Sequence, residues 1–226
     1  ALLRWTHPER GAIPPAVFIP VAEELGLIDS LGSWVFEQAT AAARRWQRSL
    51  PPGRGPASAV QITVNTSPRQ FAKGRSLAHL LDRLAALDLP GACIALEITE
   101  RLLLDEHPAV TAQLAHLGAA GLRLSIDDFG TGYSAMAYLK RLDIDTLKID
   151  RSFIRDLTTD PSDLAITEAI IAMAHKLGLT VVAEGIETAA QRDRLAAAGC
   201  DYGQGYLFSA PLPEEEFFAF LAAHRP

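Results

Sequence analysis

Residues 146–184 read TLKIDRSFIRDLTTDPSDLAITEAIIAMAHKLGLTVVAE and predict a strand, a helix and a second strand in succession. Thr146–Ile149 and Thr180–Glu184 are short β-rich runs, whereas Asp163–Leu177 carries apolar residues at the three- and four-residue spacing of a helix. Val181-Val182-Ala183 is continuously apolar, as expected for a parallel strand with both faces buried. A helix between two such strands favours a parallel sheet with covering helices.

The same alternation extends through the rest of the chain. Further strands are expected at Leu2–Trp5, Val60–Asn65, Cys93–Ile98, Leu122–Asp127 and Tyr202–Phe208. Further helices are expected at Ser33–Arg48, Leu77–Leu87, Ala109–Ala119, Ser134–Leu142, Ala189–Ala198 and Glu215–Ala223. A doubly wound nucleotide fold would usually carry a Gly-rich turn after its first strand, and none is present. We therefore predict an α/β fold of the β/α (TIM-like) barrel type.

The number of expected strands bears on where the domain begins. Seven are expected, whereas a closed barrel of this type needs eight. The N-terminal strand is therefore expected upstream of Ala1, in a longer parent chain. Residues 1–226 would then be most of a single barrel domain.

The composition excludes several classes of protein. The chain has 226 residues, of which 49% are apolar and 21% charged, which is ordinary for a globular protein. The longest apolar run, Phe217–Ala223, is far shorter than the ~20 residues of a membrane span. A net charge of −6 without a basic block argues against a DNA-binding surface. Cys93 and Cys200 lie in apolar settings typical of packed thiols, so a cytoplasmic location is expected, including as the cytoplasmic part of a membrane-attached parent.

Polar residues occupy the same end of six expected strands. They are Asn65, Glu97, Asp127 with Asp128, Lys148, Glu184 and Gln204. Catalytic residues of β/α barrels cluster at this end of the strands. Taken singly, Asn65, the Asp pair and Gln204 are also compatible with caps, turns or loops. The charged residues Glu97, Lys148 and Glu184 follow apolar residues in runs that should be buried, where an unpaired charge is very costly.

Four of these residues are acidic, which predicts a metal site. Carboxylates that converge cannot all ionise without counter-charge, and two divalent cations would balance four of them. Oxygen ligands favour magnesium or manganese over zinc. Two such ions suit in-line displacement at phosphorus, because they activate water and stabilise the attacking and leaving oxygens. Lys148 would then be a fixed cation near a phosphate oxygen or the attacking water. Arg4 could pair with a phosphate or be an ordinary surface arginine.

Several motifs occur in order along nearly the whole chain. They are Ala1-Leu2-Leu3-Arg4-Trp5, Val64-Asn65-Thr66-Ser67, Glu97-Ile98-Thr99-Glu100, Asp127-Asp128-Phe129-Gly130-Thr131-Gly132-Tyr133-Ser134, Leu147-Lys148-Ile149-Asp150, Ala183-Glu184-Gly185-Ile186-Glu187 and Gln204-Gly205-Tyr206-Leu207-Phe208. Together they resemble the EAL-domain family of cyclic di-GMP phosphodiesterases. The resemblance implies a β/α barrel that hydrolyses cyclic di-GMP to linear pGpG with two magnesium or manganese ions.

The resemblance also implies a role for each motif residue. The metal ligands would be Asn65, Glu97, Asp127, Asp128 and Glu184. The catalytic group would comprise Lys148, which assists the attacking water, together with Glu184 and Gln204. Substrate contacts are expected from Leu2, Arg4, Asp128 and Gln204. Support for the site and for the loop after Asp128 is expected from Glu100, Thr131 and Glu187.

Other expectations concern the surroundings of the domain. The glutamate of the Glu-Ala-Leu motif would be the residue before Ala1, so the chain as given should bind metal poorly. The resemblance implies a homodimer through residues 134–142, and upstream sensory or cyclase domains are possible. Two alternatives stay open at this point. One is a catalytically silent module that binds cyclic di-GMP, and the other is a barrel aldolase that uses Lys148 as a Schiff base.

Overall fold

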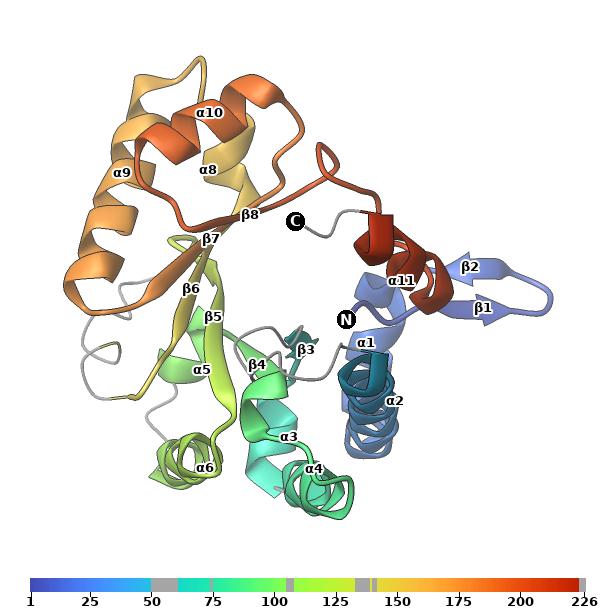
Figure 1. Ribbon diagram of the computed structural model, residues 1–226. Helices are drawn as coiled ribbons and strands as arrows, with labels where there is room; N and C mark the ends of the chain where they lie inside the picture. Colours follow the sequence, from blue (N-terminus) through green and yellow to red (C-terminus); the bar gives the residue numbers. More distant parts are fainter. Residues whose placement is uncertain (50–60, 74, 105–107, 133–138, 140–141, 224–226) are drawn as a thin grey trace. The chain divides into compact units, whose positions relative to one another are not determined.

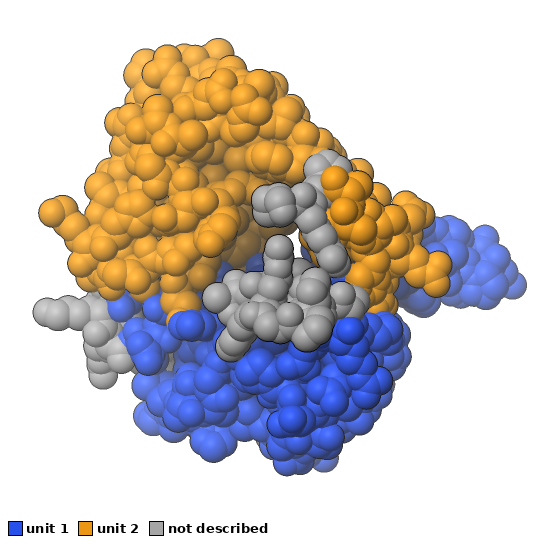
Figure 2. All heavy atoms as spheres, viewed as in Figure 1, with its two compact units in different colours: residues 1–126, 135–144 blue, residues 127–134, 145–226 orange. Residues whose placement is uncertain are grey.

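The computed structural model describes residues 1–49, 61–73, 75–104, 108–132, 139 and 142–223 (Figure 1). The chain divides into two compact units, which Figure 2 distinguishes by colour. Unit 1 comprises residues 1–126 and 135–144, and unit 2 comprises residues 127–134 and 145–226. Most of the expected helix Ser134–Leu142, and with it the predicted dimer contact, lies outside the described residues.

Unit 1 begins with a hairpin and continues with alternating helices and strands. Its elements are β1 (Trp5–His7), β2 (Gly11–Ile13), α1 (Pro15–Glu24), α2 (Ile28–Ser49), β3 (Ile62–Asn65), α3 (Pro68–Lys73), α4 (Arg75–Ala86), the 3-10 turn η2 (Gly91–Cys93), β4 (Ile94–Thr99), α5 (Glu100–Leu104), α6 (Pro108–Ala119) and most of β5 (Arg123–Phe129). Unit 2 takes over at Asp127, within β5.

Unit 2 continues the same alternation. Its elements are β6 (Thr146–Ile149), α8 (Arg151–Arg155), α9 (Pro161–Lys176), β7 (Thr180–Glu184), α10 (Ala189–Ala197), β8 (Tyr202–Gln204) and α11 (Glu214–Ala223). Among the described residues of both units, no helix is both long enough and apolar enough to cross a membrane.

Strands β3 to β8 form one six-stranded sheet whose strand order is their order along the chain. The pairs β3–β4, β6–β7 and β7–β8 are parallel. A doubly wound sheet reverses its strand order at a switch point, whereas a β/α barrel does not. The strand order therefore confirms the predicted α/β class and its TIM-like type.

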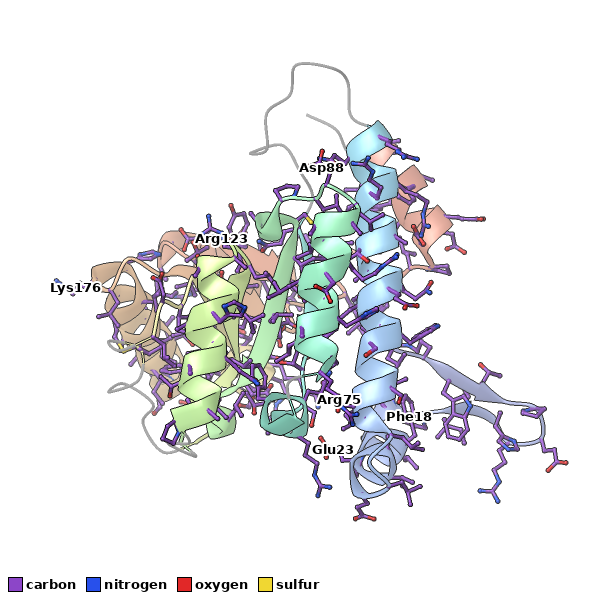
Figure 3. The ribbon with its side chains drawn as sticks, turned by 90° about the horizontal axis from the view of Figure 1, so that it is seen from below. Phe18, Glu23, Arg75, Asp88, Arg123 and Lys176 are labelled. Atoms are coloured by element: carbon purple, nitrogen blue, oxygen red, sulfur yellow. The ribbon has the colours of Figure 1, made fainter. Side chains whose placement is uncertain are left out.

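The core of unit 1 lies between its helices and its strands. Figure 3 shows α2, α4 and α6 side by side, and α2 packs on α4. Phe36 of α2, Phe71 of α3 and Leu80 of α4 are fully buried together with the apolar residues of β4. Each such side chain contributes roughly 1.5–3 kcal/mol when it leaves water. This burial explains why α2 and α4 carry their apolar residues on one face.

Polar caps define where the helices of unit 2 begin. Asp150 accepts a hydrogen bond from the Ser152 amide at the start of α8, and Asp160 accepts one from the Ser162 amide at the start of α9. Thr188 and Gln191 form a reciprocal capping box at the start of α10. These bonds satisfy amides that a helix cannot pair internally. Each cap therefore fixes the residue at which its helix begins.

Both cysteines are free thiols, as the sequence predicts. Cys93 is buried, and burial raises its pKa to about 11. Cys200 is half-buried, and its sulfur lies within hydrogen-bond distance of the carbonyls of Val181 and Tyr202. Burial also raises the pKa of Cys200. Neither thiol has the lowered pKa of a reactive cysteine.

Two expected strands differ from the structure. Leu2–Trp5 is wrong for its first three residues, because the strand starts at Trp5 and pairs antiparallel with β2 in a separate two-stranded sheet. Nδ1 of His7 accepts hydrogen bonds from the backbone amides of Glu9 and Arg10, which closes that hairpin. The run Tyr202–Phe208 is extended only as far as Gln204, because the chain turns at Gly205.

Candidate active site

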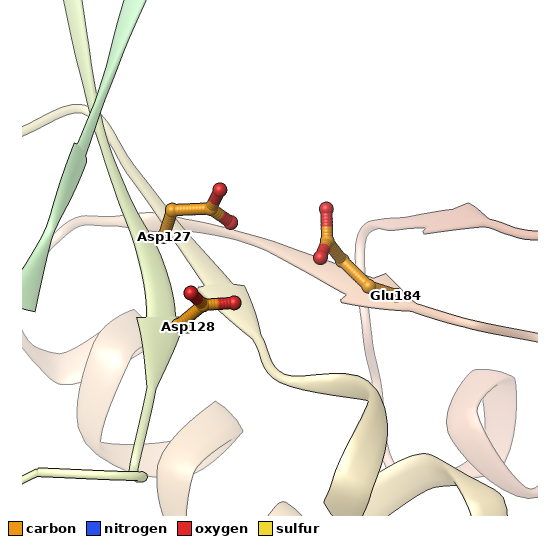
Figure 4. Close-up of side chains that lie close together, drawn as sticks. All are labelled: Asp127, Asp128 and Glu184. Carbon is orange, nitrogen blue, oxygen red and sulfur yellow. The ribbon is translucent and has the colours of Figure 1, made fainter. Parts of the chain in front are cut away.

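The end of β5 carries two consecutive aspartates whose carboxylates share one region. Successive side chains of a strand normally point to opposite faces. Asp128, however, has a left-handed backbone with φ of +53°, a conformation that Asp tolerates better than most residues. Asp128 therefore interrupts the alternation of side chains along β5. Figure 4 shows the carboxylates of Asp127 and Asp128 converging with that of Glu184, which lies on β7. One carboxylate oxygen from each lies within 4.8 Å of the other two.

A buried lysine lies within this acidic cluster. Nζ of Lys148 is 2.5 Å from Oε1 of Glu184 and 3.0 Å from Oδ1 of Asp127. The side chain of Lys148 is 7% exposed, that of Asp127 is 15% exposed and that of Glu184 is 18% exposed. A buried charge of this kind needs a partner, and Lys148 has two. The strand pairing explains the placement, because β6 and β7 are hydrogen-bonded neighbours.

Asp150 extends the acidic cluster from β6 toward α8. Asp128 is exposed, but partial desolvation raises its pKa, and the charge of Asp127 and a hydrogen bond with Asp150 raise it further, while Lys148 opposes the shift. Burial also acts to raise the pKa of Asp150, but hydrogen bonds from Ser152 and Asp128 outweigh it and leave that pKa lowered. Asp128 therefore holds a proton more readily than an ordinary aspartate.

Thr131 supports the turn that follows Asp128. Its hydroxyl donates to the carbonyl of Asp128 at 2.9 Å, and its amide points to the same oxygen at 3.4 Å. Thr131 was predicted to support this loop, and it directly contacts the backbone of the residue that carries the left-handed conformation.

Gln204 lies beside Glu184 at the end of the sheet. The two residues are register partners on β8 and β7. Gln204 is exposed, and its carbonyl accepts a hydrogen bond from the Ile186 amide. A Cβ at Gly205 would lie 2.1 Å from the Ile186 carbonyl oxygen, so the chain can make this approach only with glycine. Glu187 is also exposed, and its amide donates to the side chain of Gln191.

Two further predicted ligands are neighbours in unit 1. Asn65 and Glu97 are register partners at the ends of β3 and β4. Glu97 is 5% exposed. Thr66 donates both its amide, at 3.0 Å, and its hydroxyl, at 2.8 Å, to the carbonyl of Glu97. These bonds continue the β3–β4 pairing beyond Asn65 and fix the two strand ends against each other.

The remaining predicted residues of unit 1 have varied surroundings. Leu2 is exposed, and Arg4 donates from Nη1 to the carbonyl of Leu3 at 2.9 Å. Glu100 is the first residue of α5 and is buried. The amino group of Ala1 donates to the carbonyl of Thr63 on β3.

The acidic cluster fits divalent cations in its chemistry. Its donors are carboxylate oxygens, which magnesium and manganese prefer. Oδ1 of Asp127 is buried and accepts no hydrogen bond from the described residues, although Lys148 lies 3.0 Å away. Among the described residues, the ammonium of Lys148 pairs with two of the three carboxylates, so a divalent cation would further reduce the repulsion between them.

The comparisons with known proteins identify the family. The family model described as the EAL domain matches residues 1–211. The chain belongs to the EAL domain family. This EAL domain is 42% identical over 222 residues to the bifunctional diguanylate cyclase/cyclic di-GMP phosphodiesterase MucR of Pseudomonas aeruginosa, which covers 98% of the chain and 32% of MucR. It is likewise 42% identical over 221 residues to the signaling protein YkoW of Bacillus subtilis, covering 98% of the chain and 27% of YkoW.

A solved structure agrees with these relatives. The PaMucR phosphodiesterase in complex with c-di-GMP superposes on this EAL domain with a TM-score of 0.87 and 42% identity. The match covers 96% of this chain and 85% of that one. The chain spans less than a third of the length of MucR and of YkoW.

Three residues received no role from sequence reasoning, although Thr66 and Asp150 lie within quoted motifs. Asp150 contacts Asp128, Thr66 ties β3 to β4, and Gln191 bonds the segment after Glu184. The sequence does carry a signal for Gln191, because Thr188-x-x-Gln191 is a capping-box pattern. Asp150 two residues before Ser152 is likewise typical of a helix N-cap. For Thr66 no sequence signal distinguishes it from an ordinary strand residue.

Proposed function

We propose that this EAL domain is a metal-dependent phosphodiesterase that hydrolyses cyclic di-GMP to linear pGpG. The observation that carries the proposal is the group of three carboxylates around a buried lysine, in a member of this family. MucR is named as a cyclic di-GMP phosphodiesterase, and its structure contains c-di-GMP. Both support the same nucleotide as the substrate of this chain.

The proposed metal ligands are the carboxylates of the acidic cluster. Asp127, Asp128 and Glu184 would hold two divalent cations, magnesium or manganese. Asn65 and Glu97 are proposed as further ligands on the resemblance to the family. When bound, such ions lower the pKa of water and neutralise charge on a phosphodiester.

The remaining residues would position the reactants. The oxygen of a water molecule forms a bond to phosphorus while the P–O3′ bond breaks, and the 3′ oxygen takes up a proton. Lys148 would hold its ammonium beside the attacking water or a phosphate oxygen, since two ion pairs fix Nζ. The amide of Gln204 would orient that water or the substrate, and Arg4 with Leu2 would contact the nucleotide.

Two alternatives predict different products. A silent binding module would hold cyclic di-GMP without cleaving it. An aldolase needs Lys148 as a neutral amine that attacks a carbonyl, whereas the two adjacent carboxylates favour the charged ammonium. The geometry therefore supports hydrolysis over Schiff-base chemistry.

Hydrolysis measured by chromatography tests the proposal. The protein is purified with the glutamate that is expected before Ala1, incubated with cyclic di-GMP and Mn²⁺, or with EDTA, and pGpG is quantified. We expect pGpG with Mn²⁺, none with EDTA, and none from Glu184→Gln. The matched control is Glu168→Gln, an exposed glutamate on α9 of the same unit, which should keep wild-type activity. Tight nucleotide binding without pGpG would favour the silent module, and borohydride trapping of a carbonyl compound would favour the aldolase.

A further inference from the structure

The side chain of Gln191 uses its full hydrogen-bonding capacity. Gln191 lies in the first turn of α10 and is 6% exposed. Its Oε1 accepts the amides of Glu187 and Thr188, both at 2.9 Å. Its Nε2 donates to the carbonyls of Ile154 at 3.0 Å and Arg155 at 3.1 Å. A primary amide offers two donors and two acceptor positions, so all four are occupied.

These four bonds connect two segments that each begin at a residue of the site. Glu187 and Thr188 end the segment that follows Glu184. Ile154 and Arg155 end α8, which starts three residues after Lys148. One buried amide therefore joins the chain beyond Glu184 to the chain beyond Lys148.

The strand pairing alone does not fix Glu184 on the β6 side. The β6–β7 register ends with Ile149 opposite Ala183, one residue before Glu184. Beyond that point the two segments meet at Gly185, which has φ of +72° and whose Cβ, if present, would lie 2.7 Å from Cβ of Arg151. Gln191 supplies the hydrogen bonds that hold this close approach.

We propose that Gln191 is a positioning residue that sets the distance between Glu184 and Lys148. The inference rests on the proposed function, in which Glu184 binds metal and Lys148 lies beside the attacking water. Gln191 contacts neither residue and acts through the segment 185–188 and through α8. Its removal should therefore loosen Glu184 as a ligand, beyond any effect on folding.

The test compares substitutions within one capping box, each made in the protein that carries the glutamate expected before Ala1. Gln191→Met keeps the volume and removes all four bonds. Gln191→Glu keeps acceptors for the amides of Glu187 and Thr188 but loses the donors to α8. The control is Thr188→Ala, which removes the other half of the capping box and leaves the Gln191 bridge intact. Gln191→Met and Thr188→Ala should lower Tm because they weaken the start of α10, and Gln191→Glu should lower it because it places a buried carboxylate against the carbonyls of α8.

Manganese affinity separates positioning from folding. Isothermal titration with Mn²⁺ alone should give a Kd about tenfold higher for Gln191→Met, as typically follows loss of a residue that orients a metal ligand. Gln191→Glu should lie between that value and wild type, and Thr188→Ala should keep the wild-type Kd. At saturating Mn²⁺, kcat should fall for Gln191→Met while KM for cyclic di-GMP stays near wild type.

Three results would overturn the inference. A wild-type Kd in Gln191→Met, at lowered Tm, would make the residue purely structural. An equal rise in Kd in Thr188→Ala would assign the effect to general loosening of α10. Should Gln191→Met fail to fold by circular dichroism, a wild-type Kd in Gln191→Glu would also be decisive against it. Absence of both Mn²⁺ binding and hydrolysis in the wild type that carries the glutamate expected before Ala1 would instead refute the proposed function, and the inference with it.

Discussion

Nζ of Lys148 lies 2.5 Å from Oε1 of Glu184, within a group that also contains Asp127 and Asp128. The lysine is thus the cation that balances the carboxylates when no metal is bound. Its ammonium and a divalent cation have overlapping electrostatic roles, since both reduce repulsion between the same oxygens. This relationship makes the stability of the protein depend on metal in a way that substitution of Lys148 should expose.

Lys148→Met should make the protein depend on metal for stability. Without the ammonium, the carboxylates repel one another, so Tm in EDTA should fall well below that of wild type. Added Mn²⁺ should raise Tm by more in Lys148→Met than in wild type, as measured by differential scanning fluorimetry. Hydrolysis should fall by about 10²-fold or more, as for loss of a group that assists proton transfer. Lys176→Met, an exposed lysine at the end of α9, is the control; equal Mn²⁺ shifts in all three proteins would contradict the prediction.

Asp128→Asn should remove a pH-dependent cost in the metal-free protein. Partial desolvation and the charge of Asp127 raise the pKa of Asp128 in the folded state. The stabilisation from its protonated form is therefore complete below the ordinary value of about 3.9 and is lost as pH rises through the raised pKa. Asn cannot ionise and tolerates the left-handed backbone. Urea unfolding in EDTA from about pH 4 to about pH 7 should show a smaller loss of stability in Asp128→Asn than in wild type.

Asp88 offers a matched control for that experiment. It is an exposed aspartate that also has a positive φ, of +50°. Asp88→Asn should leave the pH profile of stability as in wild type. Identical profiles for Asp128→Asn and wild type would refute the assignment of this pH dependence to Asp128.

Asp201→Asn should destabilise the protein near neutral pH and have less effect in acid. Burial acts to raise the pKa of Asp201, but hydrogen bonds from His175 and the Val181 amide outweigh it, so the pKa is lowered. The stabilisation is thus present above about 3.9 and lost as pH falls through the lower folded value. Denaturant unfolding should show that the difference in unfolding free energy between Asp201→Asn and wild type becomes smaller as the pH falls. Asp193→Asn, an exposed surface aspartate, should match wild type throughout.

Gly205→Ala should disturb the strand end that carries Gln204. The added Cβ would lie 2.1 Å from the Ile186 carbonyl oxygen, which is backbone and cannot simply rotate away. We expect a loss of about 1–3 kcal/mol in unfolding free energy, as for an overpacked site, together with lower hydrolysis. Gly118→Ala in α6 meets nothing within 4 Å and should stabilise by roughly 0.4–1 kcal/mol. Equal stabilities of the two variants would show that the backbone at Gly205 can relax.

The sequence predicts the parallel strands well because their signals are local. Thr146–Ile149 and Thr180–Glu184 match the structure at both ends, and each is a buried run followed by a helix start. Helix α1 and the short helices α3, α5 and α8 were not predicted. The three short helices have five or six residues each, too few to show a helical period, and α1 contains an internal proline, Pro20. Leu2–Trp5 failed because an apolar run does not reveal whether its partner is parallel or antiparallel.

The sequence was enough to predict that the acidic residues converge, but not the geometry in which they do so. The position of Asp127, Asp128, Lys148 and Glu184 at strand ends is enough to expect their convergence. The left-handed backbone of Asp128, which brings two consecutive carboxylates together, depends on the turn that Thr131 closes. The bridge made by Gln191 depends on residues up to 37 positions apart. Such contacts arise only when α8 and the start of α10 are packed in three dimensions.

The backbone at position 128 also limits how this protein can change over evolutionary time. A φ of +53° is readily adopted only by glycine, asparagine and aspartate. Most other residues there would add roughly 1–2 kcal/mol of strain, whatever their chemistry. If the proposed function holds, a descendant that loses hydrolysis is expected to accept Asn or Gly at this position, because both keep the turn and remove the charge.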